Sequence, residues 1–260
     1  MRYALAVEYN GAPFSGWQRQ KHSRSVQEVL EVALGRVADH PIVIAAAGRT
    51  DAGVHANAQI VHFDTTVDRL DKAWVLGTNS HLPAAVSVHW VSQVSDDFHA
   101  RYKAVSRRYR YTILNRKARP GCGAEYLAWV NQPLDDQRMH EAAQQLLGNH
   151  DFSAFRSAQC QASHANRHLL EVAVSRVEDR VYIDVLGNAF LHNMVRIIAG
   201  TLIKIGRGER PAEWVKDLLE SGDRTKAGAT AAAAGLCFVQ ANYPPEFGVP
   251  DFSLSSQVFR

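Results

Sequence analysis

The sequence has no long apolar run and few cysteines. No stretch approaches the ~18 consecutive apolar residues of a membrane span, so we expect no transmembrane helix. Cys122, Cys160 and Cys237 are odd in number, far apart and without a C-x-x-C pair. We therefore expect neither a disulfide framework nor a zinc site. The N-terminus shows no signal-peptide pattern, which predicts a reduced, cytoplasmic location.

The sequence also lacks a strong excess of charge, although its cations are concentrated in one segment. The net charge is +3 in 260 residues, which does not by itself predict a nucleic-acid partner. Residues 101–119 contain no Asp or Glu. Their cations are Arg101, Lys103, Arg107, Arg108, Arg110, Arg116, Lys117 and Arg119. Tyr102, Tyr109 and Tyr111 lie among them, a pattern that favours binding of a polyanion with stackable bases over a merely solvated surface.

Hydrophobic periodicity predicts two α+β halves with the same order, β-α-β-β-α-β. In the first half we expect strands at 3–9, 42–47, around 60–62 and 86–91, with a helix opened by the capping box Ser25-x-x-Glu28 and another over 70–76. In the second half we expect strands at 107–115, 170–177, 181–186 and 236–241, with helices at 135–147, 190–205, 214–219 and 225–233. The predicted domains are 1–103 and 104–243, with an irregular tail at 244–260. Two such halves suggest sheets that meet side by side around a cleft.

The segment Ala47–Ala56, AGRTDAGVHA, carries the highest density of reactive groups. It follows a predicted buried strand and holds Asp51, the only carboxylate between Asp39 and Asp64. One interpretation is a turn in which Thr50 or Asp51 caps a helix. A phosphate loop is excluded, because Val54 and His55 stand where Lys and Ser/Thr are needed. The third interpretation is a catalytic carboxylate with a cationic neighbour, Arg49.

The sequence resembles the tRNA pseudouridine synthase A family over residues 3 to 243. The segment GRTDAGVHA at 48–56 is similar to the active-site motif of that family. Further similar segments, in family order, are Tyr9–Gly11, Phe14–Gln20, Ser25–Glu28, Asp97–Arg101, Arg107–Tyr111 and Asn188–Arg196. Together these motifs are far more specific than any one of them.

The resemblance implies the pseudouridine synthase fold and an isomerase that converts uridines 38–40 in the anticodon stem-loop of tRNA to pseudouridine. It implies Asp51 as the catalytic carboxylate, Tyr109 as a substrate contact and Arg196 as the arginine of the last motif. The reaction requires no metal, nucleotide or organic cofactor. The family is homodimeric, with one tRNA crossing both subunits. Reasonable phosphate contacts are Arg49, Arg101, Arg107, Arg108, Arg110 and Arg167.

Each of the other catalytic candidates has a purely structural alternative. Arg196 lies off the apolar face of its predicted helix, in line with Ala199 and Gly200, where it pairs with Asp51 or extends to water. In the strand pattern Tyr109 and Tyr111 share one face and Arg108 and Arg110 share the other. Tyr109 is therefore either a base-stacking residue whose hydroxyl helps to move the C5 proton, or a core tyrosine.

Two alternative functions remain open at this point. A non-catalytic RNA-binding module would explain the basic strand but gives Asp51 no role. A metal-assisted hydrolase could use Asp51, His55 and His62, although no ligand set with metal spacing surrounds them. The sequence departs from the family pattern at 162–166 and in the Ala-rich segment 228–234, which puts local tRNA contacts there in doubt.

Overall fold

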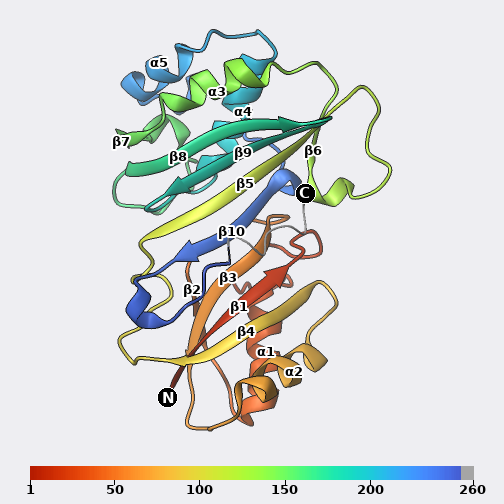
Figure 1. Ribbon diagram of the computed structural model, residues 1–260, viewed down its shortest axis with the longest axis vertical. Helices are drawn as coiled ribbons and strands as arrows, with labels where there is room; N and C mark the ends of the chain where they lie inside the picture. The colour runs from red at the N-terminus through yellow and green to blue at the C-terminus, as the bar shows by residue number, and fades with distance from the viewer. Residues whose placement is uncertain (253–260) are drawn as a thin grey trace. The chain divides into compact units, whose positions relative to one another are not determined.

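The computed structural model describes residues 1–252, which form two compact units of strands and helices (Figure 1). The first unit contains Met1–Arg107 and the segment that starts at Cys237, and the second contains Arg108–Leu236. The predicted α+β class is confirmed, because each unit combines a sheet with helices. Residues 253–260 of the predicted irregular tail lie outside the described residues, and 244–252 contain only the short 3-10 helix Pro245–Phe247.

The first unit follows the predicted order of strands and helices. Its elements are β1 (Arg2–Tyr9), α1 (Val26–Ala38), β2 (Ile44–Ala46), β3 (His55–Asp64), α2 (Asp71–His81), β4 (Val86–Val94) and β10 (Leu236–Asn242). The strands lie in the order β4-β1-β3-β10, and β2 pairs with β3. β1 is antiparallel to β3 and β4, whereas β10 is parallel to β3. α1 and α2 pack against each other, and α2 contacts β4.

Local sequence explains most of these elements. The Ser25 hydroxyl accepts a hydrogen bond from the backbone N–H of Glu28 (3.2 Å), so the predicted N-cap of α1 is confirmed. α1 then buries Leu30, Ala33 and Leu34 toward the core. It ends at Asp39, whose backbone is left-handed with φ 58°. β1 is buried on both faces, as expected for a central strand.

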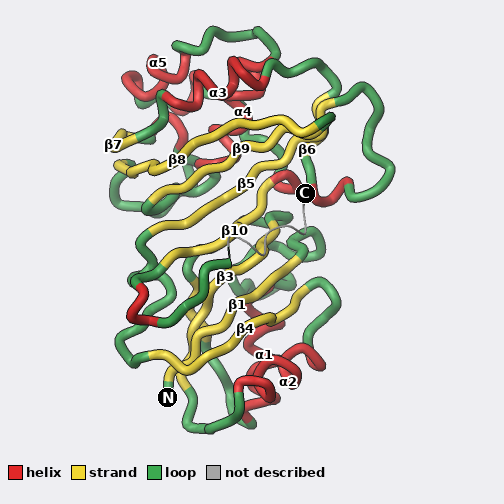
Figure 2. Tube along the Cα trace, in the orientation of Figure 1, coloured by secondary structure: helices red, strands yellow, loops and turns green. Residues whose placement is uncertain are grey.

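The second unit contains the remaining elements. They are β5 (Ser106–Asn115), β6 (Ala128–Val130), α3 (Asp136–Gln144), β7 (Gly148–Asp151), β8 (Asn166–Val177), β9 (Arg180–Gly187), α4 (Met194–Gly206) and α5 (Trp214–Ser221). Its strands lie in the order β5-β9-β8-β7, and β6 pairs with β5. α3 contacts α4, α5 and β8, and the three helices lie together in Figure 2. Within residues 1–252, no helix has the length and apolar character needed to cross a bilayer.

Two helices of the second unit differ from the prediction. The helix expected over 190–205 begins at Met194, because Asn193 has a left-handed backbone (φ 62°) and residues 192–193 form a turn. The helix expected over 225–233 does not form; only Arg224–Lys226 and Ala233–Gly235 make 3-10 turns. The backbone of segment 228–232 instead bonds to groups of α4 and β5, as described below, so it does not need the hydrogen bonds of a helix of its own.

The division of the chain also differs from the predicted domains. The first unit extends to Arg107 rather than 103, and the strand predicted to close the second domain belongs with the first unit. The reason is a long-range pairing, in which Cys237 and Phe238 of β10 align with His55 and Ala56 of β3. The order of elements along the chain, taken alone, assigns this strand to the second half, which directly precedes it in sequence.

Candidate active site

Asp51 lies in a tight turn between β2 and β3. The backbone N–H of Val54 donates to the carbonyl oxygen of Asp51 (3.1 Å), and Gly53 occupies the turn with φ 77°, a conformation that favours glycine. The neighbouring Thr50 is buried, and its hydroxyl lies 2.7 Å from that of Tyr9. Asp51 itself is half-buried. The turn therefore holds a carboxylate at the surface on a fixed backbone.

The chain after β1 packs directly on this turn. The N–H of Gly11 donates to Nδ1 of the buried His55 (3.0 Å), and the N–H of Trp17 donates to the carbonyl of Thr50 (2.9 Å). A Cβ at Gly11 would overlap the carbonyl of Val54, so only glycine fits there. The N-terminal motif and the Asp51 motif, distant in sequence, thus form a single substructure.

One residue that supports the loop is not among the predicted site residues. Gln59 is fully buried in β3, where its amide nitrogen donates to the carbonyl of Gly48 (2.7 Å) and its amide oxygen accepts from the Gly48 N–H (3.3 Å). This pair fixes the entry to the Asp51 loop. A polar side chain in the middle of an otherwise apolar buried strand is the signal that could have identified it.

Arg107 also holds the Asp51 loop in place. Its guanidinium donates to the carbonyls of Ala104 (3.1 Å), Ala47 (3.3 Å) and Arg101 (2.5 Å). It therefore joins the turn at 101–104 to the residue that precedes Gly48. Arg49 and Arg101 are exposed. Binding of RNA phosphate by these three arginines stays a prediction.

The predicted two faces of the basic strand are present in β5. Tyr109 and Tyr111 are buried, whereas Arg108 and Arg110 are partly exposed. The ring of Tyr109 lies 4.9 Å from that of Phe190, edge to face, and remains 8% exposed. The hydroxyl of Tyr111 donates to the carbonyl of Ala232 (2.9 Å), and burial raises its pKa. Tyr109 is therefore the candidate for substrate contact, and Tyr111 a core residue.

The two arginines of this strand form bidentate ion pairs. Arg108 bonds Glu171 (3.0 and 2.7 Å), which lowers the pKa of that carboxyl. Arg110 bonds Asp184 (2.8 and 3.0 Å), and this hydrogen bonding raises the pKa of the arginine. These pairs orient both guanidinium groups on the sheet. The phosphate contacts predicted for Arg108 and Arg110 stay predictions.

Arg196 is half-buried in the first turn of α4 and bonds to segment 228–232. Its Nε donates to the carbonyl of Ala231 (2.8 Å), and its Nη1 donates to Oδ1 of Asn193 (2.8 Å). One turn further along α4, segment 228–232 lies directly against Gly200, where a Cβ would overlap the carbonyl of Ala229. Segment 228–232, where the sequence departs from the family pattern, therefore holds Arg196 in place.

Arg167, the last predicted phosphate contact, begins β8. Its Nη1 donates to the carbonyls of Asn166 (2.6 Å) and His164 (3.1 Å), and partial burial lowers its pKa. Its Nε is buried and makes no hydrogen bond to the described residues. The loop at 160–162 is held by Arg156, which donates to the carbonyls of Cys160 and Ala162.

The histidines considered as metal ligands have structural partners. Nδ1 of the buried His62 accepts from the N–H of Ala100 (3.2 Å), just as Nδ1 of His55 accepts from Gly11. Within residues 1–252, no three or more His, Cys, Asp or Glu side chains are grouped as a metal site would require. Burial, with the nearby His99 and Arg2 as smaller causes, lowers the pKa of His62 from 6.5 to about 4.

This buried ring predicts a pH-dependent stability. The unfolded ring takes up a proton below pH 6.5, whereas the folded ring does so only near pH 4. The contribution of this ring to the free energy of unfolding is therefore complete above pH 6.5. It decreases as the pH is lowered toward 4, by up to about 3 kcal/mol. Urea unfolding at several pH values measures this loss. His62→Asn, which keeps an acceptor for Ala100, is expected to flatten the profile, whereas His22→Asn at an exposed position is not. If the free energy of unfolding depended on pH equally in the native protein and both variants, His62 would not be the group responsible.

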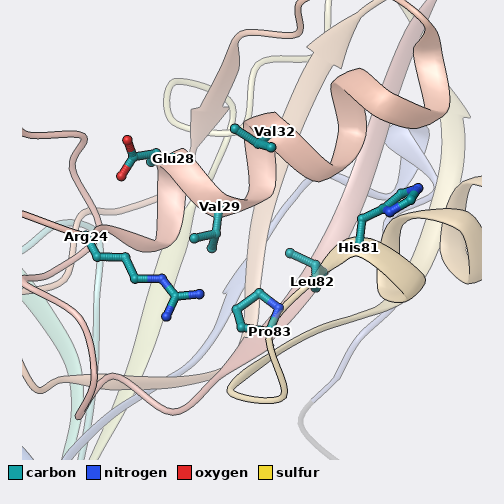
Figure 3. A pocket seen from close by; sticks show the side chains of 7 residues that line it. All are labelled: Arg24, Glu28, Val29, Val32, His81, Leu82 and Pro83. Carbon is teal, nitrogen blue, oxygen red and sulfur yellow. The ribbon is translucent and has the colours of Figure 1, made fainter.

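A pocket elsewhere on the first unit contains none of the predicted site residues. It lies between the start of α1 and the end of α2 (Figure 3). Its lining residues are Arg24, Glu28, Val29, Val32, His81, Leu82 and Pro83. Its lining includes a single carboxylate, Glu28, and no glycine. The Asp51 loop remains the better candidate for catalysis.

Comparison with known proteins decides the family. The sequence model described as tRNA pseudouridine synthase matches residues 5–103 and 142–244. The chain belongs to this family. It is 54% identical to tRNA pseudouridine synthase A of Pseudoalteromonas atlantica over 98% of this chain and 97% of the relative. The corresponding enzyme of Hydrogenovibrio crunogenus is 53% identical over 95% and 94%, and that of Xylella fastidiosa 53% over 96% and 98%.

Membership in the tRNA pseudouridine synthase family makes this protein an isomerase that acts on tRNA. The family match contains the Asp51 loop in its first part and Arg167 and Arg196 in its second. It leaves out 104–141, the stretch that holds Tyr109 and its neighbouring arginines. The relatives nevertheless align over 95% or more of the chain, so the overall similarity is not confined to the matched parts.

Proposed function

We propose that this synthase converts uridines 38, 39 and 40 in the anticodon stem-loop of tRNA to pseudouridine, without a cofactor and with Asp51 as the catalytic carboxylate. The observation that carries the proposal is the Asp51 turn. It is closed by Gly53, bonded to Tyr9 through Thr50, and covered by a segment in which only glycine fits at position 11. Such a support fixes a reactive group before the substrate arrives.

The reaction explains why a fixed carboxylate is needed. The bond between C1′ and N1 of the uridine breaks, the uracil turns over, and a new bond forms between C1′ and C5. The C5 proton is lost and N1 gains a proton, so no atom is added in total and no electron is transferred. An ionised Asp51 either attacks C1′ or removes a proton from the sugar. Both routes require the same carboxylate beside the sugar, near C1′.

We propose Tyr109 and Arg196 as the partners of Asp51. The ring of Tyr109, oriented by Phe190, stacks on the extruded base, and its hydroxyl helps to move the C5 proton. The guanidinium of Arg196, oriented by Asn193 and Ala231, pairs with Asp51 and orients that carboxylate. Asp51 belongs to the first unit and the other two residues to the second. The double variant of Asp51→Asn and Arg196→Lys tests this pairing.

The proposed substrate fits the cost of base extrusion and the distribution of cations. Removing a base from its stack costs a few kcal/mol and is easiest in a loop or at a helix end, which an anticodon stem-loop provides. We propose that Arg49, Arg101, Arg107, Arg108, Arg110 and Arg167 contribute phosphate contacts. We further propose a homodimer that acts in the cytoplasm, as the family resemblance implies.

Tritium release from tRNA labelled at uracil C5 tests the proposal directly. Transcripts carry uridine at 38, 39 or 40 in turn, and a control transcript carries cytidine at all three. We expect release from each uridine transcript in excess chelator and none from the control. Binding without release from any transcript would favour the RNA-binding module. Release that stops in chelator would favour metal-assisted chemistry.

Tyr109→Phe separates the two roles proposed for this tyrosine. The ring and its contact with Phe190 are kept, so tRNA binding is expected to change less than twofold. Loss of the hydroxyl is expected to lower the rate of tritium release about 10²-fold or more. Tyr182→Phe, at a buried position on the neighbouring strand β9, is the matched control and should retain turnover. A normal rate in Tyr109→Phe would remove the hydroxyl from the mechanism.

A further inference from the structure

Three aromatic rings form a column that runs from the core of the first unit to its surface. The rings of His62 and His99 lie 4.5 Å apart, and those of His99 and Tyr102 lie 4.3 Å apart. His62 is 6% exposed, whereas Tyr102 is 74% exposed. Tyr102 is thus a large aromatic side chain at the surface, and its ring contacts the tilted ring of His99 at an interplanar angle of 34°. Neither catalysis by Asp51 nor packing of the core explains its exposure.

The backbone around Tyr102 is bonded to this column. The N–H groups of Arg101 and Tyr102 both point to Nδ1 of His99 (3.1 and 3.3 Å), and the N–H of Lys103 donates to the His99 carbonyl (3.0 Å). One residue earlier, the N–H of Ala100 donates to His62. Since each histidine accepts at Nδ1, the two rings act as neutral acceptors. Burial lowers the pKa of both, in agreement with this role.

Three long-range contacts hold the same turn. Arg2 donates to the carbonyls of Phe98 (2.8 Å) and Asp96 (2.6 Å), and the hydroxyl of Tyr243 donates to the carbonyl of Ala100 (2.6 Å). Arg107 bonds the carbonyls of Arg101 and Ala47, which connects the turn to the entry of the Asp51 loop. The position of Tyr102 is therefore fixed relative to the candidate catalytic loop of the same unit.

The charges around the exposed ring favour a polyanion. The guanidinium carbon of Arg101 lies 5.7 Å from the centroid of the Tyr102 ring, and Lys103 follows in sequence. No Asp or Glu occurs between residues 98 and 119. Asp96 and Asp97 precede the turn, and Asp64 is paired with Arg2. An exposed aromatic ring beside cations is the arrangement with which proteins bind single-stranded RNA.

We propose that Tyr102 is a stacking platform for an unpaired nucleobase of the bound tRNA, a base other than the target uridine. This inference rests on the proposed function. The ligand is a base in a loop or at a helix end, because only an unpaired base offers a free face. Stacking tolerates any base, so the site contributes affinity and placement rather than sequence selection.

Substitutions at position 102 distinguish stacking from other roles. Tyr102→Ala removes the ring, Tyr102→Leu keeps apolar bulk without a π-face, and Tyr102→Phe keeps the π-face without the hydroxyl. We expect the Ala and Leu variants to bind unmodified tRNA transcript about tenfold more weakly, and the Phe variant to bind within twofold of the native protein. The KM for tritium release should rise in parallel, with the rate at saturating tRNA unchanged.

The alternative outcomes each overturn the proposal. Native affinity in Tyr102→Ala would show that no base stacks there. Equal weakening in the Ala and Phe variants would assign the effect to the hydroxyl, and native affinity in the Leu variant would assign it to apolar contact alone. Tritium release by the native protein tests the proposed function independently, so a failure of that function is recognised even where the binding results support stacking.

Discussion

Asp51→Asn is expected to lower pseudouridine formation about 10³-fold or more. The amide has nearly the shape of the carboxylate but cannot attack C1′ as an anion or accept a proton from the sugar. The hydrogen bonds described above for the turn use backbone groups of Asp51 and Thr50 and the side chain of Thr50, so the variant retains them. The change therefore removes the chemistry of the carboxylate and keeps these hydrogen bonds.

The measurement is single-turnover tritium release, together with tRNA affinity and the thermal midpoint of each protein. Asp39→Asn is the matched control, since it removes one negative charge from the same unit at an exposed position. Its left-handed backbone (φ 58°) is one that asparagine also adopts. We expect the control to turn over normally and both proteins to bind tRNA. Substantial turnover by Asp51→Asn would assign the catalytic role to another group.

Arg196→Lys is expected to lower turnover about 10²-fold although the charge is retained. A guanidinium donates through several N–H groups in one plane, whereas an ammonium is a compact charge on a flexible chain. Arg196 uses its Nε for Ala231 and its Nη1 for Asn193, which fixes the plane of the group. Lysine cannot reproduce this orientation, so it cannot present the same hydrogen bonds to a carboxylate.

The competing explanation for lower turnover in Arg196→Lys is that segment 228–232 detaches from α4. Thr201→Val controls for this effect. The Thr201 hydroxyl accepts from the N–H of Gly228 (3.1 Å) and lies away from the proposed reaction. This variant should unfold at a lower urea concentration yet keep its turnover. In the double variant of Asp51→Asn and Arg196→Lys, a paired function predicts little further loss beyond the Asp51 change alone. Full additivity of the two effects would contradict the pairing.

Local signals were sufficient to predict most of the first unit. The capping box at Ser25 and the strand patterns at 3–9 and around 60–62 each depend on a few residues, and α1, β1 and β3 form there. The Asp51 loop could be located for the same reason, because its glycines and reactive groups are consecutive. The resemblance to a family then supplied roles for Arg196 and Tyr109 that residue types alone left open.

The features that could not be predicted from the sequence depend on contacts between residues that are far apart in the chain. The alanines of segment 228–232 favour a helix by local propensity, but Thr201, Arg196 and Tyr111 bond its backbone instead. Gln59 supports the Asp51 loop through contacts that no sequence period indicates. The ring column at Tyr102 needs both β3 and the turn after β4. Such contacts are tertiary and could not be predicted from a local window.

The parallel pairing of β10 with β3 has a consequence for synthesis of the chain. Cys237 lies beside His55, so the sheet that carries the Asp51 loop receives this strand only after the whole of the second unit has been synthesised. Until then, β3 has an unpaired edge along residues adjoining the candidate catalytic turn. We therefore expect a nascent or truncated chain that ends before residue 237 to be prone to aggregation, and the sheet of the first unit to be completed late in folding.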